Sequence, residues 1–183
     1  MARWEPVLDE VMRERSPRLL AYARLLTGDD AEAQDVLQDA LVRSFSRGRA
    51  FDNANLAEAY VRRAIPSVFI DRLRRRKAAE RAHDRDVSLG GRDVLTLDRD
   101  VVIDVRAALA ALPPQERACI VLRFYDDLTV PQISAQLGIA EGTVKRYLSD
   151  ASGKLTRLLG EDVDASTGAT GVPVQPAMKG ARP

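Results

Sequence analysis

The sequence predicts an all-α fold in which two small helical domains are joined by a flexible linker. Apolar residues recur at helical spacing along most of the chain, and the strong helix formers Ala, Leu, Arg and Glu are abundant. This periodicity disappears over residues 78–100, where charged residues alternate around Gly90 and Gly91. The expected organisation is a first domain over residues 1–77, a linker over 78–100, a helix-turn-helix domain over 101–159 and a disordered tail over 160–183.

Composition excludes several classes of protein. The chain has 183 residues, 45% apolar and 30% charged, as is typical of a globular protein. No apolar run approaches the ~20 residues that span a bilayer, and no signal segment follows Met1, so we expect a cytoplasmic protein without membrane insertion. The single cysteine, Cys119, lies in an apolar run and is expected to be buried. With one histidine besides, the chain is expected to hold no metal and no cofactor.

The formal net charge of +1 hides two regions of opposite sign. Residues 29–39 carry five acids and no base, whereas residues 62–85 carry nine Arg or Lys against three acids. An acidic and a basic surface on one chain suggest two different partners.

Three helices are expected in the first domain. Helical periodicity begins after Trp4 and ends at the break formed by Gly28 and Asp29. The second helix covers residues 31–45, and its acids lie near its N-terminus, where the helix dipole favours them.

A polar loop over residues 47–55 leads to the third helix, which we expect over residues 56–76. Pro66 should kink or divide this helix, because proline removes a backbone hydrogen bond. The candidate core positions of the third helix are Tyr60, Val61, Ala64, Val68 and Leu73.

The second domain begins with helices over residues 101–112 and 115–125, separated by Pro113 and Pro114. Thr129 and Gln132 then form a capping-box pattern, and Gly138 supplies the left-handed residue that reverses the chain. This layout predicts a helix-turn-helix, whose second helix would read the major groove, although an ordinary helical hairpin remains an alternative. The candidate DNA-binding residues of that helix are Glu141, Thr143, Lys145, Arg146 and Ser149.

Several blocks in a fixed order resemble a known family. DDAEAQDVLQDALVRSF and AYVRRAIPSVFIDRLRRRK in the first domain resemble the conserved blocks of bacterial RNA polymerase sigma factors. LPPQERACIVLRFYDDLTVPQISAQLGIAEGTVKRYL resembles the promoter-binding domain of the same family. The compact two-domain form is similar to the extracytoplasmic-function branch, and the resemblance covers about residues 10–159.

The resemblance implies that the helix over 31–45 docks on core RNA polymerase, at the coiled coil of its large subunit. Without the resemblance, a merely solvated acidic helix end would be the preferred interpretation of this segment. The candidate polymerase-binding residues are Asp35, Leu37, Gln38, Asp39, Leu41 and Phe45.

The resemblance also implies that the third helix and the loop before it capture the displaced bases of the downstream promoter element. Arginines suit phosphates, and the loop supplies an aromatic ring and amides for an extruded base. A basic solvated helix end is the alternative; it accounts for Arg76 and Lys77 but explains the loop poorly. Relatives often carry Asn where this chain has Ser67, next to Pro66. The candidates are Phe51, Asp52, Asn53, Asn55, Arg62, Arg63, Ser67, Arg72, Arg74 and Arg75.

The leading hypothesis is therefore a dissociable initiation factor that binds core RNA polymerase and promoter DNA and catalyses no reaction itself. An anti-sigma factor is a possible further partner, because such partners are common in the family. A stand-alone helix-turn-helix regulator is the second hypothesis, and it would need neither the acidic nor the basic helix. A nuclease holding metal on Asp29, Glu32, Asp35 and Asp39 is the third, and no accompanying catalytic motif supports it.

Overall fold

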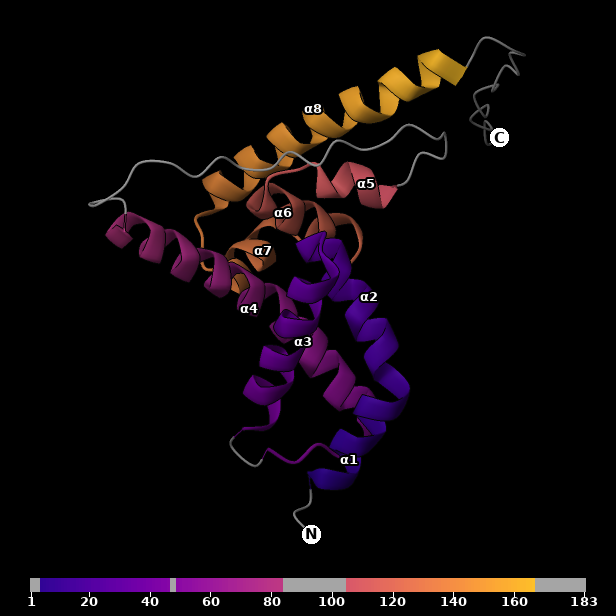
Figure 1. Ribbon diagram of the computed structural model, residues 1–183, viewed down its shortest axis with the longest axis vertical. Coiled ribbons are helices and arrows are strands. Elements are labelled where there is room, and N and C mark those ends of the chain that lie inside the picture. Colours follow the sequence, from indigo (N-terminus) through magenta and orange to yellow (C-terminus); the bar gives the residue numbers. More distant parts are fainter. Residues whose placement is uncertain (1–3, 47–48, 84–104, 167–183) are drawn as a thin grey trace, which may run out of the picture.

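The computed structural model describes residues 4–46, 49–83 and 105–166, and within these ranges the regular structure is entirely helical. This confirms the predicted all-α class. Figure 1 shows the helices, which are α1 (Glu5–Glu10), the π-helical turn η1 (Val11–Arg15), α2 (Ser16–Thr27), α3 (Asp30–Phe45), α4 (Ala54–His83), α5 (Val105–Ala110), α6 (Pro114–Phe124), α7 (Val130–Leu137) and α8 (Glu141–Ser166).

The first domain is a bundle in which α2, α3 and α4 pack against one another. α2 ends where predicted, because Gly28 adopts the left-handed conformation with φ 72°. Asp29 then caps α3 by accepting a hydrogen bond of 2.7 Å from the backbone N–H of Glu32. The side chains at the centre of the bundle are fully buried and include Leu19, Leu26, Val36, Val61, Ile65 and Phe69.

Helix α4 runs from Ala54 to His83 without interruption, so of the two expected effects of Pro66, a kink or a division of the helix, the division is wrong. Pro66 itself is fully buried, as are the neighbouring side chains of Ile65 and Phe69. Apolar burial on both sides of the proline offsets the roughly 3 kcal/mol that a proline costs inside a helix. The helix also continues through residues 78–83, which were expected to belong to the linker; the rest of that linker lies outside the described residues.

The second domain packs α6, α7 and α8 around Leu122, Ile133 and Val144. The predicted capping box is present, and the backbone N–H of Thr129 donates to Gln132 Oε1 at 2.8 Å. Gly138 has the predicted left-handed conformation, with φ 62°. The helix expected over 101–112 is observed over Val105–Ala110, and residues 101–104 lie outside the described part of the chain.

Helix α8 is longer than the sequence indicates. It continues to Ser166, although residues 160–183 were expected to be a tail without structure. That expectation is wrong for the first seven residues of the segment, and residues 167–183 lie outside the described range.

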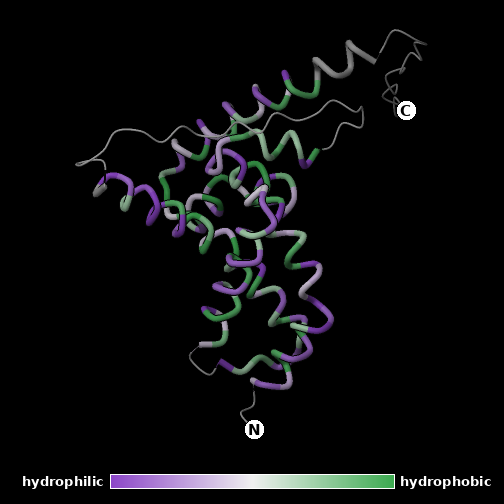
Figure 2. Tube along the Cα trace, in the orientation of Figure 1, coloured by the Kyte–Doolittle hydropathy of each residue, from purple (hydrophilic) through white to green (hydrophobic). Residues whose placement is uncertain are grey.

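The two domains are in contact. α2 packs against α6, and α4 packs against α7. The C-terminal end of α4 projects away from the other helices, and Figure 2 shows this end as largely hydrophilic. The N-terminal half of α4 therefore packs in the core of the first domain, and its C-terminal half carries a basic surface exposed to solvent.

Candidate nucleic-acid interface

The N-terminal half of α8 presents a polar surface on a fixed support. Val144 is fully buried, and Tyr147 donates a hydrogen bond of 2.8 Å from its hydroxyl to Gln115 Oε1. The guanidinium of Arg146 lies 5.3 Å from the ring centroid of Tyr147. Of the predicted DNA-binding residues, Thr143 is half-buried, and the others are exposed, namely Glu141, Lys145, Arg146 and Ser149.

The exposed residues of α8 form a row along the helix. The buried side of α8 packs against α6 and α7, and Glu141, Lys145 and Ser149 form a row at four-residue spacing on its exposed surface. Residues at this spacing on one helix can meet successive base pairs in a major groove. The helical-hairpin alternative requires no such exposed row.

Two amide side chains at the start of α4 form hydrogen bonds within the domain that the sequence did not predict. Asn53 caps α4, because its Oδ1 accepts a hydrogen bond of 3.0 Å from the backbone N–H of Leu56. Asn55 Oδ1 accepts a hydrogen bond of 3.1 Å from Arg15 Nη2. Asp52, Asn53 and Asn55 are all exposed. The two amides are therefore partly committed to holding the loop.

Three aromatic rings contact one another beside the loop: Phe45 of α3, Phe51 of the loop and Tyr60 of α4. Phe51 is half-buried, and it packs edge-on against buried Phe45 with ring centroids 5.1 Å apart. On its other side Phe51 contacts Tyr60, at 5.4 Å between centroids. Tyr60 was expected in the core, but 38% of it is exposed, and the Arg49 guanidinium lies 4.5 Å from its ring. Tyr60 is thus the more accessible stacking surface, and sequence periodicity missed it.

The arginines predicted to hold downstream DNA fall into three groups. Arg63 and Arg75 are exposed. Arg62 and Arg74 contact the second domain. Arg72 instead bridges two acids of α3, with 2.6 Å between its Nη1 and Asp39 Oδ2 and 3.0 Å between its Nη2 and an Asp35 carboxylate oxygen. Ser67 donates its hydroxyl to the backbone carbonyl of Gln136 at 3.0 Å.

The exposed surface of α3 differs from the predicted one. Leu37, Leu41 and Phe45 are less than 10% exposed and belong to the core, so the expectation that they lie on a docking surface is wrong. They point inward because α3 packs against both α2 and α4, which widens its buried side. Asp35 and Gln38 are exposed as expected, and Val42, which was not among the expected residues, is 59% exposed.

The acids of α3 are paired within the domain. The carboxylate of Asp39, acting first through its hydrogen bond, raises the pKa of the Arg72 guanidinium. Arg76 Nη2 lies 2.7 Å from Glu32 Oε1, and Asp29 caps the helix. Within the described residues, no group of three or more His, Cys, Asp or Glu side chains is arranged to hold a metal ion. These acids thus form a surface joined to α4 by ion pairs.

Cys119 is fully buried in α6, as predicted. Burial, with a smaller effect of the nearby Glu116 carboxylate, raises the pKa of the Cys119 thiol to about 12. Its thiolate is therefore scarce at neutral pH. In the part of the chain that the structure covers, no helix has the length and apolarity needed to cross a membrane.

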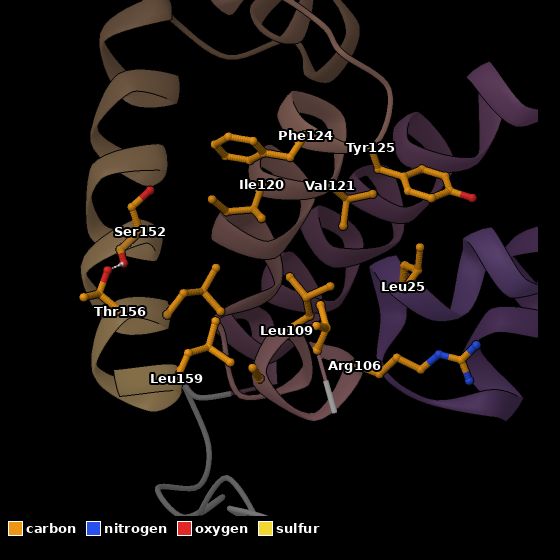
Figure 3. A pocket seen from close by; sticks show the side chains of 13 residues that line it. Leu25, Arg106, Leu109, Ile120, Val121, Phe124, Tyr125, Ser152, Thr156 and Leu159 are labelled. Atoms are coloured by element: carbon orange, nitrogen blue, oxygen red, sulfur yellow. Dashed lines mark hydrogen bonds between the residues drawn. The ribbon is translucent and has the colours of Figure 1, made fainter. Parts of the chain in front are cut away.

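A separate apolar groove of about 1120 Å³ lies where α2, α5, α6 and α8 meet. Figure 3 shows Leu109, Ile120 and Phe124 among the side chains around it, with Leu25 contributed by the first domain. Phe124 is 73% exposed. An apolar lining of this kind suits protein side chains rather than phosphates, so the groove is not part of the nucleic-acid surface.

Comparison with known proteins decides the family. Sigma-70 region 2 matches residues 11–79, and Sigma-70 region 4 matches residues 103–155. The RNA polymerase sigma-E factor of Streptomyces avermitilis is 34% identical over 160 residues, which cover 86% of this chain and 88% of the relative. The chain belongs to the sigma-70 family of sigma factors.

Two further relatives define the branch of this sigma factor. The extracytoplasmic-function sigma factor SigM of Mycobacterium tuberculosis is 32% identical over 153 residues, covering 83% of this chain and 76% of the relative. The sigma factor RpoE of Bartonella quintana, solved with the anti-sigma factor NepR, is 25% identical, with a TM-score of 0.52 over 79% of this chain and 91% of that one. This chain is an extracytoplasmic-function sigma factor, as its sequence blocks indicate.

Proposed function

We propose that this sigma factor binds core RNA polymerase through the exposed side of α3, reads an upstream promoter element with α8, and holds the melted downstream element with α4 and its preceding loop. The observation that carries the proposal is the exposed polar row of α8 on a chain that also exposes an acidic and a basic helix. A stand-alone regulator would need only the first of these surfaces.

The polymerase-binding surface differs from the expected one in its apolar component. Asp35, Gln38, Asp39 and Val42 are spaced so that they lie along one side of α3. An exposed valine beside acids and an amide is a small apolar anchor with a polar surround, which is the usual composition of a protein interface. Val42 therefore takes the place of buried Leu37, Leu41 and Phe45.

For base capture, α4 supplies positive charge and the Tyr60 ring, and the loop before it supplies Phe51. Arg63 and Arg75 are exposed and suit the backbone phosphates of DNA. Tyr60, with Phe51 behind it, supplies a flat surface on which an unstacked base can lie. Catalysis is not part of the proposal: the protein acts by binding, in the cytoplasm, where core polymerase and promoter DNA are found. An anti-sigma factor, present in the Bartonella complex, is proposed as a further partner.

Reconstitution with purified core RNA polymerase tests the proposal. Mixed with core polymerase, the protein should co-elute with it in gel filtration, and genomic DNA templates should yield transcripts with a shared upstream sequence. Core polymerase alone is the control. Binding of the chain to a duplex sequence without any association with polymerase would favour the stand-alone regulator and overturn the proposal.

A further inference from the structure

Gly142 is the second residue of α8, the helix that the proposed function assigns to the upstream promoter element. Its backbone is not left-handed, since among the described glycines only Gly28 and Gly138 have positive φ. A β-carbon at Gly142 would meet no atom within 4 Å apart from its chain neighbours and the backbone of α8 itself. Alanine would form a more stable helix at this position. Within the described residues, neither backbone conformation nor packing therefore requires a glycine here.

A hinge does not explain the glycine either, because the backbone is fixed before and after it. The Ser134 hydroxyl of α7 donates to the carbonyl of Ile139 at 2.6 Å, and the backbone N–H of Ile139 donates to the carbonyl of Ser134 at 3.2 Å. The backbone N–H of Thr143 donates to the carbonyl of Ala140 at 2.9 Å. The start of α8 is thus held to α7 through the turn.

The open space at Gly142 lies beside Arg146. Residues four apart occupy the same side of a helix, so Gly142 and Arg146 share one side of α8. Val144 is fully buried, and each of the two lies two residues from it, which is more than half a turn of an α-helix. Gly142 and Arg146 therefore lie on the side of α8 that is directed away from the core, and both are exposed.

Two successive contacts support the Arg146 side chain. Its guanidinium lies 5.3 Å from the ring centroid of Tyr147, within the range of a cation–π interaction. The Tyr147 hydroxyl donates to Gln115 Oε1 at 2.8 Å, and Gln115 lies in the first turn of α6. A guanidinium that stacks on a fixed ring loses less conformational freedom when it binds. Tyr147 and Gln115 therefore hold Arg146 in place for a ligand.

We propose that Gly142 and Arg146 form a slot in which α8 reads one guanine of the upstream promoter element, with Tyr147 and Gln115 as positioning residues. The Arg146 fork suits the two acceptors that guanine presents in the major groove. The missing side chain at Gly142 lets the edge of the base pair approach the backbone of α8 closely. The proposal rests on the proposed role of α8, and it adds the class of base that is read and the groups that select it.

Gly142→Ala separates this role from a role in folding, because the two expected effects have opposite signs. Alanine favours the helix, so the variant should unfold at an equal or higher temperature than the wild type. It should nevertheless lower the affinity for promoter DNA about tenfold, and Gly142→Leu should lower it further. Gly153→Ala and Gly153→Leu are the matched controls. Gly153 lies further along α8 with equally open space around it, so its replacement should leave the affinity unchanged.

Tyr147→Phe tests the support of Arg146, because it keeps the ring and removes only the hydrogen bond to Gln115. The preference for guanine at the position that Arg146 reads should fall about twofold to tenfold, and Gln115→Leu should have the same effect. Neither change should alter the preference further in an Arg146→Ala background, where the guanidinium is absent. An equal effect with and without the guanidinium would show a merely structural role and overturn the positioning assignment.

Affinities are measured with holoenzyme assembled from core RNA polymerase and the full chain. The wild-type holoenzyme first selects duplexes from a randomised pool, and sequencing identifies the position whose base preference Arg146→Ala removes. Fluorescence anisotropy then gives the affinity of each variant for the selected duplex and for duplexes with each other base at that position. Gel filtration checks that every variant still forms the holoenzyme, and thermal unfolding compares the stability of the variants.

Three outcomes would overturn the slot: equal affinities of Gly142→Ala and Gly153→Ala, a fall in both affinity and unfolding temperature for Gly142→Ala, or a preferred base other than guanine at the position that depends on Arg146. Each of these leaves the proposed function intact, because the holoenzyme still selects a promoter sequence. Failure of the proposed function is distinguishable, since the wild-type holoenzyme would then select no common sequence, and the slot would be overturned with it.

Discussion

Replacing Tyr60 by Ala should impair promoter melting while leaving polymerase binding intact. The Tyr60 ring is 38% exposed and covers half-buried Phe51, so its removal deletes the accessible part of the aromatic surface. Stacking of one base on an aromatic side chain contributes roughly 1–3 kcal/mol, which corresponds to a loss of about fivefold to 150-fold in open complexes. Because the ring is not fully buried, Tyr60→Ala should lower the free energy of unfolding of the protein by less than it lowers the stability of the open complex.

Asn53→Ala is the matched comparison for this variant. It removes the N-cap of α4 and should lower the free energy of unfolding of the protein by about 1 kcal/mol. The thermal unfolding temperature of the protein should fall, with no specific effect on the opening of promoter DNA. Transcription is measured on a duplex promoter and on the same promoter with a pre-opened bubble. Tyr60→Ala should lose more activity on the duplex, and Asn53→Ala should lose equally on both. Full duplex activity of Tyr60→Ala, or an equal loss on the two templates, would refute the stacking role.

Three further predictions concern the other surfaces. Arg146→Ala should cost about 1–3 kcal/mol of promoter binding free energy and relax the preference at one base position. Lys145→Ala should weaken binding evenly across sequences. A binding assay on a library of promoter variants separates the two effects. Val42→Asp should abolish association with core polymerase in gel filtration at an unchanged melting temperature, and retained association would contradict the α3 assignment. Lys154→Met should destabilise the second domain by up to about 3 kcal/mol, because both carboxylate oxygens of buried Glu116 accept hydrogen bonds from Lys154. Urea unfolding measures the loss, and an unchanged unfolding midpoint would show that water replaces the amine.

Local signals in the sequence predicted the helix ends well. Gly28, Asp29 and Gly138 act through the backbone of their immediate neighbours, so their effect can be predicted without tertiary structure. Pro66 shows the opposite case. Its local cost was correctly recognised, yet burial in the assembled core keeps α4 continuous across it.

The candidate site was predicted less completely, because exposure depends on how many neighbours a helix has. Leu37 and Leu41 were assigned to a surface, but α3 has two packing partners and buries them. Val42 lies outside that wide apolar side. A helical wheel of α3 that allows for packing against both α2 and α4 would have placed Val42 on the exposed side. The contact of Arg62 with Asp126 carried no signal, since the two residues lie 64 residues apart in the sequence.

The position of Arg72 has a consequence for how the two partners of the protein influence each other. Arg72 belongs to the basic helix α4, but it bridges Asp35 and Asp39 on the acidic helix α3. A polymerase group that withdraws these acids leaves the guanidinium available to a phosphate. Linkage is reciprocal, so promoter DNA that engages Arg72 must raise the affinity for polymerase by the same factor. Under the proposed function, this shared arginine would make the binding of polymerase and promoter cooperative.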